Sequence, residues 1–184
     1  SNIINLAGAF RDCPAFNQTL NSWDTSSAIT MANMFWGCTI FNGNITSWDT
    51  SSVTTCNNMF RSASAFNQAI GSWDMSSLTT ATLMFQDAVA FNQAVNDWGI
   101  SSSLTTMVAM FKGATLFNQP MSSWDVSGVL DMNGALRETA FNQDISGWNV
   151  SSVTKFESMF HDNTSIDQDF GSWNVTSAAN MVNM

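Results

Sequence analysis

Hydrophobic and polar positions recur along this chain with a period of 25 residues. A series of tryptophans carries the period most clearly, and a phenylalanine or, once, an isoleucine stands seven residues before each of them. A period between about 20 and 50 residues is typical of solenoids and other repeat arrays. The series consists of Trp23, Trp48, Trp73, Trp98, Trp124, Trp148 and Trp173.

The pattern inside one repeat predicts a strand, a short helix and a turn. The apolar residues of 70–78 are spaced as in the strand of a leucine-rich repeat. The apolar residues of 53–60 follow helical offsets, with Ser51 or Ser52 placed to cap the first turn. A Phe-Asn-Gln turn then leads to the next strand. The predicted strands begin at Leu20, Ile45, Ile70, Val95, Met121, Ile145 and Phe170.

These elements predict an α/β fold. We expect residues 1–184 to form a single right-handed solenoid like that of leucine-rich-repeat proteins, with a parallel sheet on one face and short helices on the other. About seven 25-residue coils would stack, because one repeat cannot bury its own apolar face. Tryptophan, phenylalanine and methionine suit the core of such a stack better than a cofactor site.

Both ends of the sequence fall inside a repeat. Ser1 is in register with Ser26, and Met184 aligns with Met34 and Met59. Solenoids normally end in capping repeats with a polar outer face. We therefore expect uncapped ends that continue into further repeats of the same protein or into identical subunits stacked end to end, as in a filament.

The repeat motif resembles that of the BspA-like leucine-rich-repeat surface proteins. Residues 148–154 read Trp-Asn-Val-Ser-Ser-Val-Thr, Met159-Phe160 follows, and residues 66–68 read Phe-Asn-Gln. The resemblance covers essentially the whole chain. It implies an extracellular or cell-surface protein used in adhesion or surface assembly, with other surface or matrix components as partners. It implies no particular ligand and no catalytic residue.

Composition narrows the range of partners. The formal net charge is −9, and only 10% of the 184 residues are charged, including five Lys and Arg. Because the cations are so few, we expect no basic stripe that could bind phosphates. Nucleic acid and anionic membrane surfaces are therefore not expected partners. No apolar run approaches the roughly 18 residues of a membrane helix, so direct membrane insertion is not expected either.

An aspartate that follows the repeat tryptophan is the first candidate site. A row of carboxylates flanked by serine hydroxyls offers the oxygen ligands that calcium prefers. Alternatively, each side-chain oxygen accepts a backbone N–H two residues on, as in an Asx turn. Replacement by Asn149 and Asn174 in later repeats favours the structural interpretation. The calcium candidates are Asp24, Asp49, Asp74 and Asp125, and we expect no other cofactor.

Two cysteines occupy the same point of adjacent repeats. Cys13 and Cys38 should therefore lie about 5 Å apart, which is within the range of disulfides. The alternative is a small buried slot for free thiols, because later repeats carry alanine there, as at Ala63 and Ala88. A bridge would favour an oxidising, extracellular setting.

The asparagines suggest one structural role and one modification. The asparagine of each Phe-Asn-Gln turn predicts a buried amide ladder from coil to coil. Among the glycosylation sequons, Asn163 is expected to be the most exposed, because it lies in the turn before a degraded repeat. The ladder consists of Asn17, Asn42, Asn67, Asn92, Asn118 and Asn142.

Nothing in the sequence predicts catalysis. The single His161 has no repeated carboxylate or serine column converging on it, so a solvated turn histidine is expected. The leading hypothesis is a non-enzymatic structural or adhesive module that acts as a rigid spacer or assembly subunit. The alternative is a recognition module that binds calcium or glycan through the Ser-Asp-Ser face. An ice-binding array is a third hypothesis, which serine in place of threonine makes less persuasive.

Overall fold

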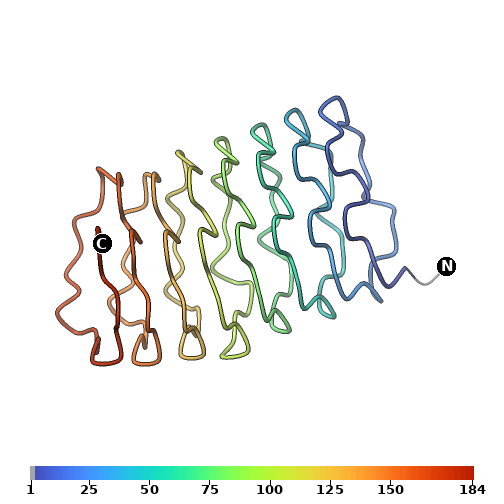
Figure 1. Ribbon diagram of the computed structural model, residues 1–184. Helices are drawn as coiled ribbons and strands as arrows, with labels where there is room; N and C mark the ends of the chain where they lie inside the picture. Colours follow the sequence, from blue (N-terminus) through green and yellow to red (C-terminus); the bar gives the residue numbers. More distant parts are fainter. Residues whose placement is uncertain (1–2) are drawn as a thin grey trace.

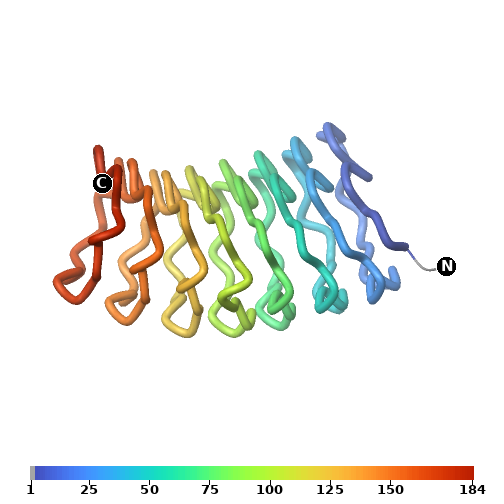
Figure 2. The backbone as a smooth tube through the Cα atoms, turned by 60° about the horizontal axis from the view of Figure 1, so that its bottom comes forward, coloured from blue at the N-terminus to red at the C-terminus, as the bar shows by residue number. Residues whose placement is uncertain are grey.

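The structure is a computed structural model that describes residues 3–184. In Figure 1 the chain winds into coils that lie side by side in sequence order, with the two termini at opposite ends of the stack. Figure 2 shows the same succession of coils from another direction. Isolated parallel bridges link each coil to the next, at Asn5↔Thr30, Thr30↔Thr55, Thr55↔Thr80, Thr80↔Thr106, Thr106↔Asp131, Asp131↔Lys155 and Lys155↔Asn180.

The predicted α/β fold is wrong. The described part of the chain contains neither a helix nor a strand longer than a single bridge, so there is no parallel sheet on one face and no row of helices on the other. The coils consist instead of consecutive turns. The expected stacking of 25-residue units does occur, but through single bridges and separate hydrogen bonds between turns.

Backbone hydrogen bonds explain why no helix forms. The amides of Met59, Arg61 and Ala63 each donate to the carbonyl three residues earlier, at 3.0–3.2 Å. The amides between them, those of Phe60 and Ser62, donate instead to carbonyls of the next coil, at 2.8 and 2.7 Å. An α-helix needs every interior amide to donate to the carbonyl four residues earlier, so this alternation is incompatible with it. A ribbon of overlapping turns replaces the predicted helix.

Two residues in each ribbon have positive φ. In the turns 56–59 and 60–63 these are Asn58 (φ 56°) and Ser62 (φ 58°), each at the third position, as in a type II turn. Glycine, which adopts this conformation without strain, takes the same place in some other coils, for example at Gly37 and Gly113. The repeated backbone conformation therefore depends mainly on hydrogen bonds from these amides to carbonyls of the next coil, and less on the residue type at the turn.

The predicted strand 70–78 also breaks into turns. The amide of Trp73 donates to the carbonyl of Ile70, and the amide of Leu78 donates to that of Met75, at 3.1 and 3.0 Å. Between these two turns the amide of Met75 reaches the carbonyl of Trp98 in the next coil, at 2.7 Å. The side chains still point as the pattern predicted, since all four apolar residues of this segment are buried.

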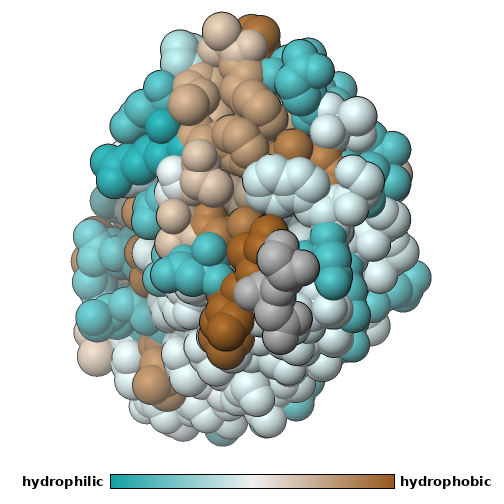
Figure 3. All heavy atoms as spheres, turned by 90° about the vertical axis from the view of Figure 1, so that its right-hand side faces the viewer, coloured by the Kyte–Doolittle hydropathy of each residue, from teal (hydrophilic) through white to brown (hydrophobic). Residues whose placement is uncertain are grey.

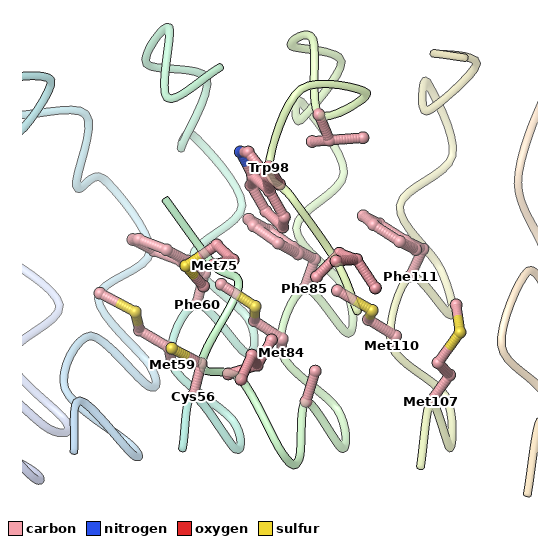
Figure 4. Packing of buried hydrophobic residues seen from close by; sticks show 14 of the residues in the cluster. Cys56, Met59, Phe60, Met75, Met84, Phe85, Trp98, Met107, Met110 and Phe111 are labelled. Atoms are coloured by element: carbon pink, nitrogen blue, oxygen red, sulfur yellow. The ribbon is translucent and has the colours of Figure 1, made fainter. Parts of the chain in front are cut away.

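Aromatic rings and methionines fill the core, as predicted. Phe60 stacks on Phe66 of its own coil at a centroid distance of 3.9 Å and on Phe85 of the next coil at 5.3 Å. Figure 4 shows Phe60, Phe85 and Phe111 in a row, with methionines such as Met84 beside them. Such columns bury the same ring type at each level of the stack.

Each inner tryptophan also satisfies a backbone carbonyl. The indole Nε1 of Trp98 donates to the carbonyl of Ile70 in the preceding coil at 2.9 Å, and that of Trp48 donates to the carbonyl of Leu20 at 2.9 Å. Trp73, Trp124, Trp148 and Trp173 make the same contact. A buried carbonyl without a donor is unfavourable, so this position requires an aromatic ring that also carries an N–H.

The two irregular repeats absorb their length changes in turns, as the sequence indicated. The coil containing Ser102 has one extra residue, and the Ser102 carbonyl lies against Gly128 of the next coil. One residue is missing near Thr139, where the amide of Phe141 donates to the Thr139 hydroxyl at 3.4 Å. In a regular coil the equivalent amide, that of Phe66, donates to a backbone carbonyl.

Gly128→Ser is expected to lower the free energy of unfolding by about 1–3 kcal/mol, because a Cβ at Gly128 would collide with the Ser102 carbonyl. Other coils carry serine at this position, for example Ser52 and Ser77. Gly147→Ser is the matched control: a Cβ there meets nothing within 4 Å, so a change within about 0.5 kcal/mol is expected. Urea unfolding measures both. Equal stabilities of the two variants would contradict the assigned clash.

The first coil of the stack exposes part of its apolar surface. Ile4 is 55% exposed, and Phe10 and Phe16 are only partly buried, whereas Phe35 and Phe41, their equivalents one coil later, are fully buried. Figure 3 views this end of the molecule and shows brown apolar side chains among polar ones. The end coil therefore packs its aromatic rings against a neighbour on one side only.

Candidate functional site

The four predicted calcium ligands lie at equivalent corners of their coils and are exposed. In each, Oδ1 accepts the backbone N–H of the residue two positions on, at 2.9–3.2 Å. Asn149 and Asn174 accept the same bond at 3.2 Å. This geometry confirms the Asx-turn interpretation. The aspartates are Asp24, Asp49, Asp74 and Asp125.

Serine donors stabilise the charged form of several of these carboxylates. Hydrogen bonds from the side chain and backbone of Ser76 lower the pKa of Asp74 below its ordinary value, and Ser127 lowers the pKa of Asp125 in the same way. Ser26 lowers the pKa of Asp24. These carboxylates are therefore ionised at neutral pH, although one oxygen of each already accepts a hydrogen bond.

Calcium binding at this corner stays a prediction. Calcium takes about six to eight oxygen ligands. Within residues 3–184 no group of three or more His, Cys, Asp or Glu side chains is arranged to hold a metal ion. Backbone carbonyls, serine hydroxyls and water would have to complete any coordination shell around these aspartates.

The amide ladder is confirmed, although its members are exposed or half-buried and not fully buried. The side-chain Oδ1 of Asn67 accepts the backbone N–H of Asn92 at 3.0 Å, and Asn92 accepts that of Asn118 at 3.0 Å. Five of the six ladder asparagines also accept a bond from a glutamine side chain of the next coil, as Asn67 does from Gln93 at 3.0 Å. The ladder thus ties one turn of each coil to the next.

The cysteines are free thiols in this structure. Cys13 is exposed, and Cys38 is buried with its Sγ 2.9 Å from the carbonyl of Phe10. Burial raises the pKa of the Cys38 thiol, and it raises that of Cys56 to about 12. The buried slot is thus present at Cys38, while the Cys13–Cys38 disulfide stays a prediction.

The expectation that Asn163 is exposed is wrong. Its side chain is buried, with Nδ2 donating to the Phe141 carbonyl at 3.0 Å and to the Thr139 hydroxyl at 3.3 Å. Its Oδ1 accepts the amides of Ser165 and Ile166. Asn163 takes the place that small residues fill in other coils. A glycan on Nδ2 would not fit this folded coil.

A shallow hollow lies between the turns of two adjacent coils. It has a volume of about 390 Å³ and is lined by Asp144, Ser146, Gln168, Asp169 and Ser172. The serine donors of residue 146 lower the pKa of Asp144. The hollow therefore presents carboxylates and hydroxyls.

His161 lies beside a carboxylate at the edge of its coil. Its Nδ1 is 2.7 Å from Oδ2 of Asp162, and its side chain is 36% exposed. This contact joins neighbouring residues of one turn, in keeping with the turn histidine expected from the sequence.

Most of the few cations of this chain gather in one line along the stack, an arrangement that the sequence analysis did not predict. Residues at equivalent positions of successive coils form a line that includes four of the five Lys and Arg residues and the single histidine. We call this line the cation column. It consists of Arg11, Trp36, Arg61, Gln86, Lys112, Arg137 and His161. Sequence reasoning missed it because it judged net charge and not the register of the few cations within the repeat.

The fold and its surfaces define a stacked repeat protein. A family model described as "Mycoplasma protein of unknown function, DUF285" matches residues 4–104 and again residues 100–184. The chain belongs to the DUF285 family. No match was found among curated proteins or among solved structures. No helix within residues 3–184 is long and apolar enough to cross a membrane.

Proposed function

We propose that this chain is a non-enzymatic structural or adhesive repeat module of a BspA-like protein located outside the cell or on its surface. The main support is the continuity of the hydrogen-bonded amide ladder, which runs from Asn17 to Asp167 and ties every coil in between to its neighbours. A stack tied at every level resists bending, as a spacer must. The Trp-Asn-Val-Ser and Phe-Asn-Gln motifs support the surface role by resemblance.

The proposed partners are further repeats of the same protein or identical subunits stacked end to end. The way equivalent coils bury one another's rings supports this, because Phe35 and Phe41 are fully buried between neighbouring coils of the same kind. Other surface or matrix components are the second group of proposed partners.

Antibody labelling of intact cells that produce the protein tests the location. We expect an antibody raised against this segment to label unpermeabilised cells or the material around them. Labelling that appears only after permeabilisation would refute the proposal. An antibody against a cytosolic protein is the control for cell integrity.

Calcium binding through the aspartate corners is the second candidate function, favoured by exposed carboxylates at equivalent positions of several coils, among which serine donors lower the pKa of Asp24 and Asp74. If it is correct, millimolar calcium raises Tm, and the double variant Asp49→Asn with Asp74→Asn abolishes the rise. Asp12→Asn is the matched control, since that carboxylate lies in a different part of its coil and pairs with Arg11. An unchanged Tm of the original protein with calcium would exclude this candidate.

A further inference from the structure

The cation column holds a tryptophan between two arginines. The guanidinium carbon of Arg11, one coil before, lies 4.0 Å from the Trp36 ring centroid, and that of Arg61, one coil after, lies 4.8 Å from it. Trp36 is the one tryptophan outside the repeat series, and it is only partly buried. Stacking on an aromatic face fixes a guanidinium and leaves its N–H groups directed outward along the ring plane.

Two cations of the column have no carboxylate partner. Within the described residues, Arg11 pairs with Asp12 at 3.3 Å, and Arg137 pairs with Glu138 at 2.8 Å, whereas no ion pair involves Arg61 or Lys112. The reason lies in the next residue of the chain. Where the outer coils carry an acid after the cation, these two coils carry Ser62 and Gly113.

The unpaired cations lie two coils apart on the same side of the stack. Coils joined by parallel bridges are about 5 Å apart, so Arg61 and Lys112 present positive charge at intervals of about 10 Å along the axis. Asp87, in the coil between them, is the one acid that follows a column residue in this stretch. Residues 36–112 of the column thus form a local positive line on a chain of net charge −9.

An amide in the middle of this line lacks a donor. Gln86 Oε1 is buried and accepts no hydrogen bond from the described residues. Because this oxygen is buried, a ligand at the surface does not reach it, and Gln86 serves as a neutral spacer between the two cations. The line therefore offers two cations, one of which is held by an aromatic ring.

We propose that Arg61, oriented by Trp36, and Lys112 form a binding site for an acidic polysaccharide whose chain runs along the stack. Arginine and lysine would pair with its carboxylate or sulfate groups. An acidic peptide is the weaker choice, because peptide recognition normally depends on desolvated apolar anchor pockets. The hollow lined by Asp144 and Ser146 does not lie along Trp36, Arg61 or Lys112.

This proposal adds a ligand class to the proposed surface role and uses a different part of the coil from the aspartate corners. The test of location and the test of binding are separate. The protein can lie at the cell surface without binding an acidic glycan, and it can bind an acidic glycan without lying at the cell surface.

Affinity electrophoresis in gels containing alginate, dextran sulfate or neutral dextran provides the test. We expect alginate or dextran sulfate, but not neutral dextran, to retard the protein. The double variant Arg61→Gln with Lys112→Gln is expected to weaken this binding about tenfold, since each exposed charge contact contributes a few-fold to affinity. Asp87→Asn is expected to strengthen it a few-fold, because it removes the acid between the two cations.

Lys155→Gln is the matched control. Lys155 pairs with Asp131 at 3.3 Å and lies outside the column, so its loss should leave binding unchanged. Circular dichroism and thermal melting show whether each variant folds, and the expected gain for Asp87→Asn does not depend on a loss of function. Three results would overturn the proposal: no retardation of the original protein, equal weakening by Lys155→Gln, or retardation by poly-L-glutamate with none by either acidic glycan.

Discussion

Trp98→Ala is expected to lower the free energy of unfolding by about 3–5 kcal/mol, one of the largest effects of any single substitution in this chain. Trp98 is fully buried at the middle of the stack, and its ring lies between those of Trp73 and Trp124 at centroid distances of 6.5 and 6.0 Å. Alanine would leave a cavity facing both neighbouring coils. Urea unfolding followed by circular dichroism measures the loss.

Trp98→Phe separates the hydrogen bond from the packing. Phenylalanine keeps most of the ring but removes the donor to the Ile70 carbonyl, so a loss of about 1–3 kcal/mol is expected. Leu116→Ala is the control, because Leu116 is 58% exposed and its truncation should change stability by no more than about 0.5 kcal/mol. If Trp98→Phe were as stable as the original protein, the indole bond would have no stabilising role.

The sequence predicted which side chains face inward but not which backbone conformation carries them. Val53, Cys56, Met59 and Phe60 are all buried, as their helical spacing suggested. A ribbon of overlapping turns brings the same positions to one side as a helix does. The spacing of apolar residues therefore cannot distinguish the two, because the difference lies in whether an amide donates within its own coil or to the next one.

Some features of the candidate sites could be predicted from the sequence, and others could not. The asparagine ladder and the Asx turns could be predicted because each repeats a residue type whose short side chain bonds to nearby backbone. The burial of Asn163 could not be predicted, because its side chain bonds to Thr139 one coil earlier, where a residue is missing. The cation column requires the register of residues such as Arg11 and Arg61 within the coil, which net charge does not reveal.

The asparagine ladder leads to the second large effect. Asn92 occupies an inner rung, where its Oδ1 accepts the backbone N–H of Asn118 at 3.0 Å and the side-chain amide of Gln119 at 2.9 Å. Asn92→Ala removes the acceptor and leaves the Asn118 amide unpaired in a half-buried turn, while Gln119 keeps its bond to the Asn92 carbonyl at 3.2 Å. A donor without a partner is more costly than the bond itself is favourable.

We therefore expect Asn92→Ala to lower the free energy of unfolding by about 1–3 kcal/mol, measured by urea unfolding. Asn92→Asp is the matched variant, because it retains a side-chain oxygen as the acceptor and replaces only the NH2 group, and Asp167 takes the corresponding position in a later coil. It should lose less than half as much stability. Amide hydrogen exchange adds a local readout: the Asn118 amide should exchange faster in Asn92→Ala and near its original rate in Asn92→Asp. Equal losses in both variants would show that the ladder depends on the whole amide group, and unchanged exchange at Asn118 would show that this rung does not hold the turn.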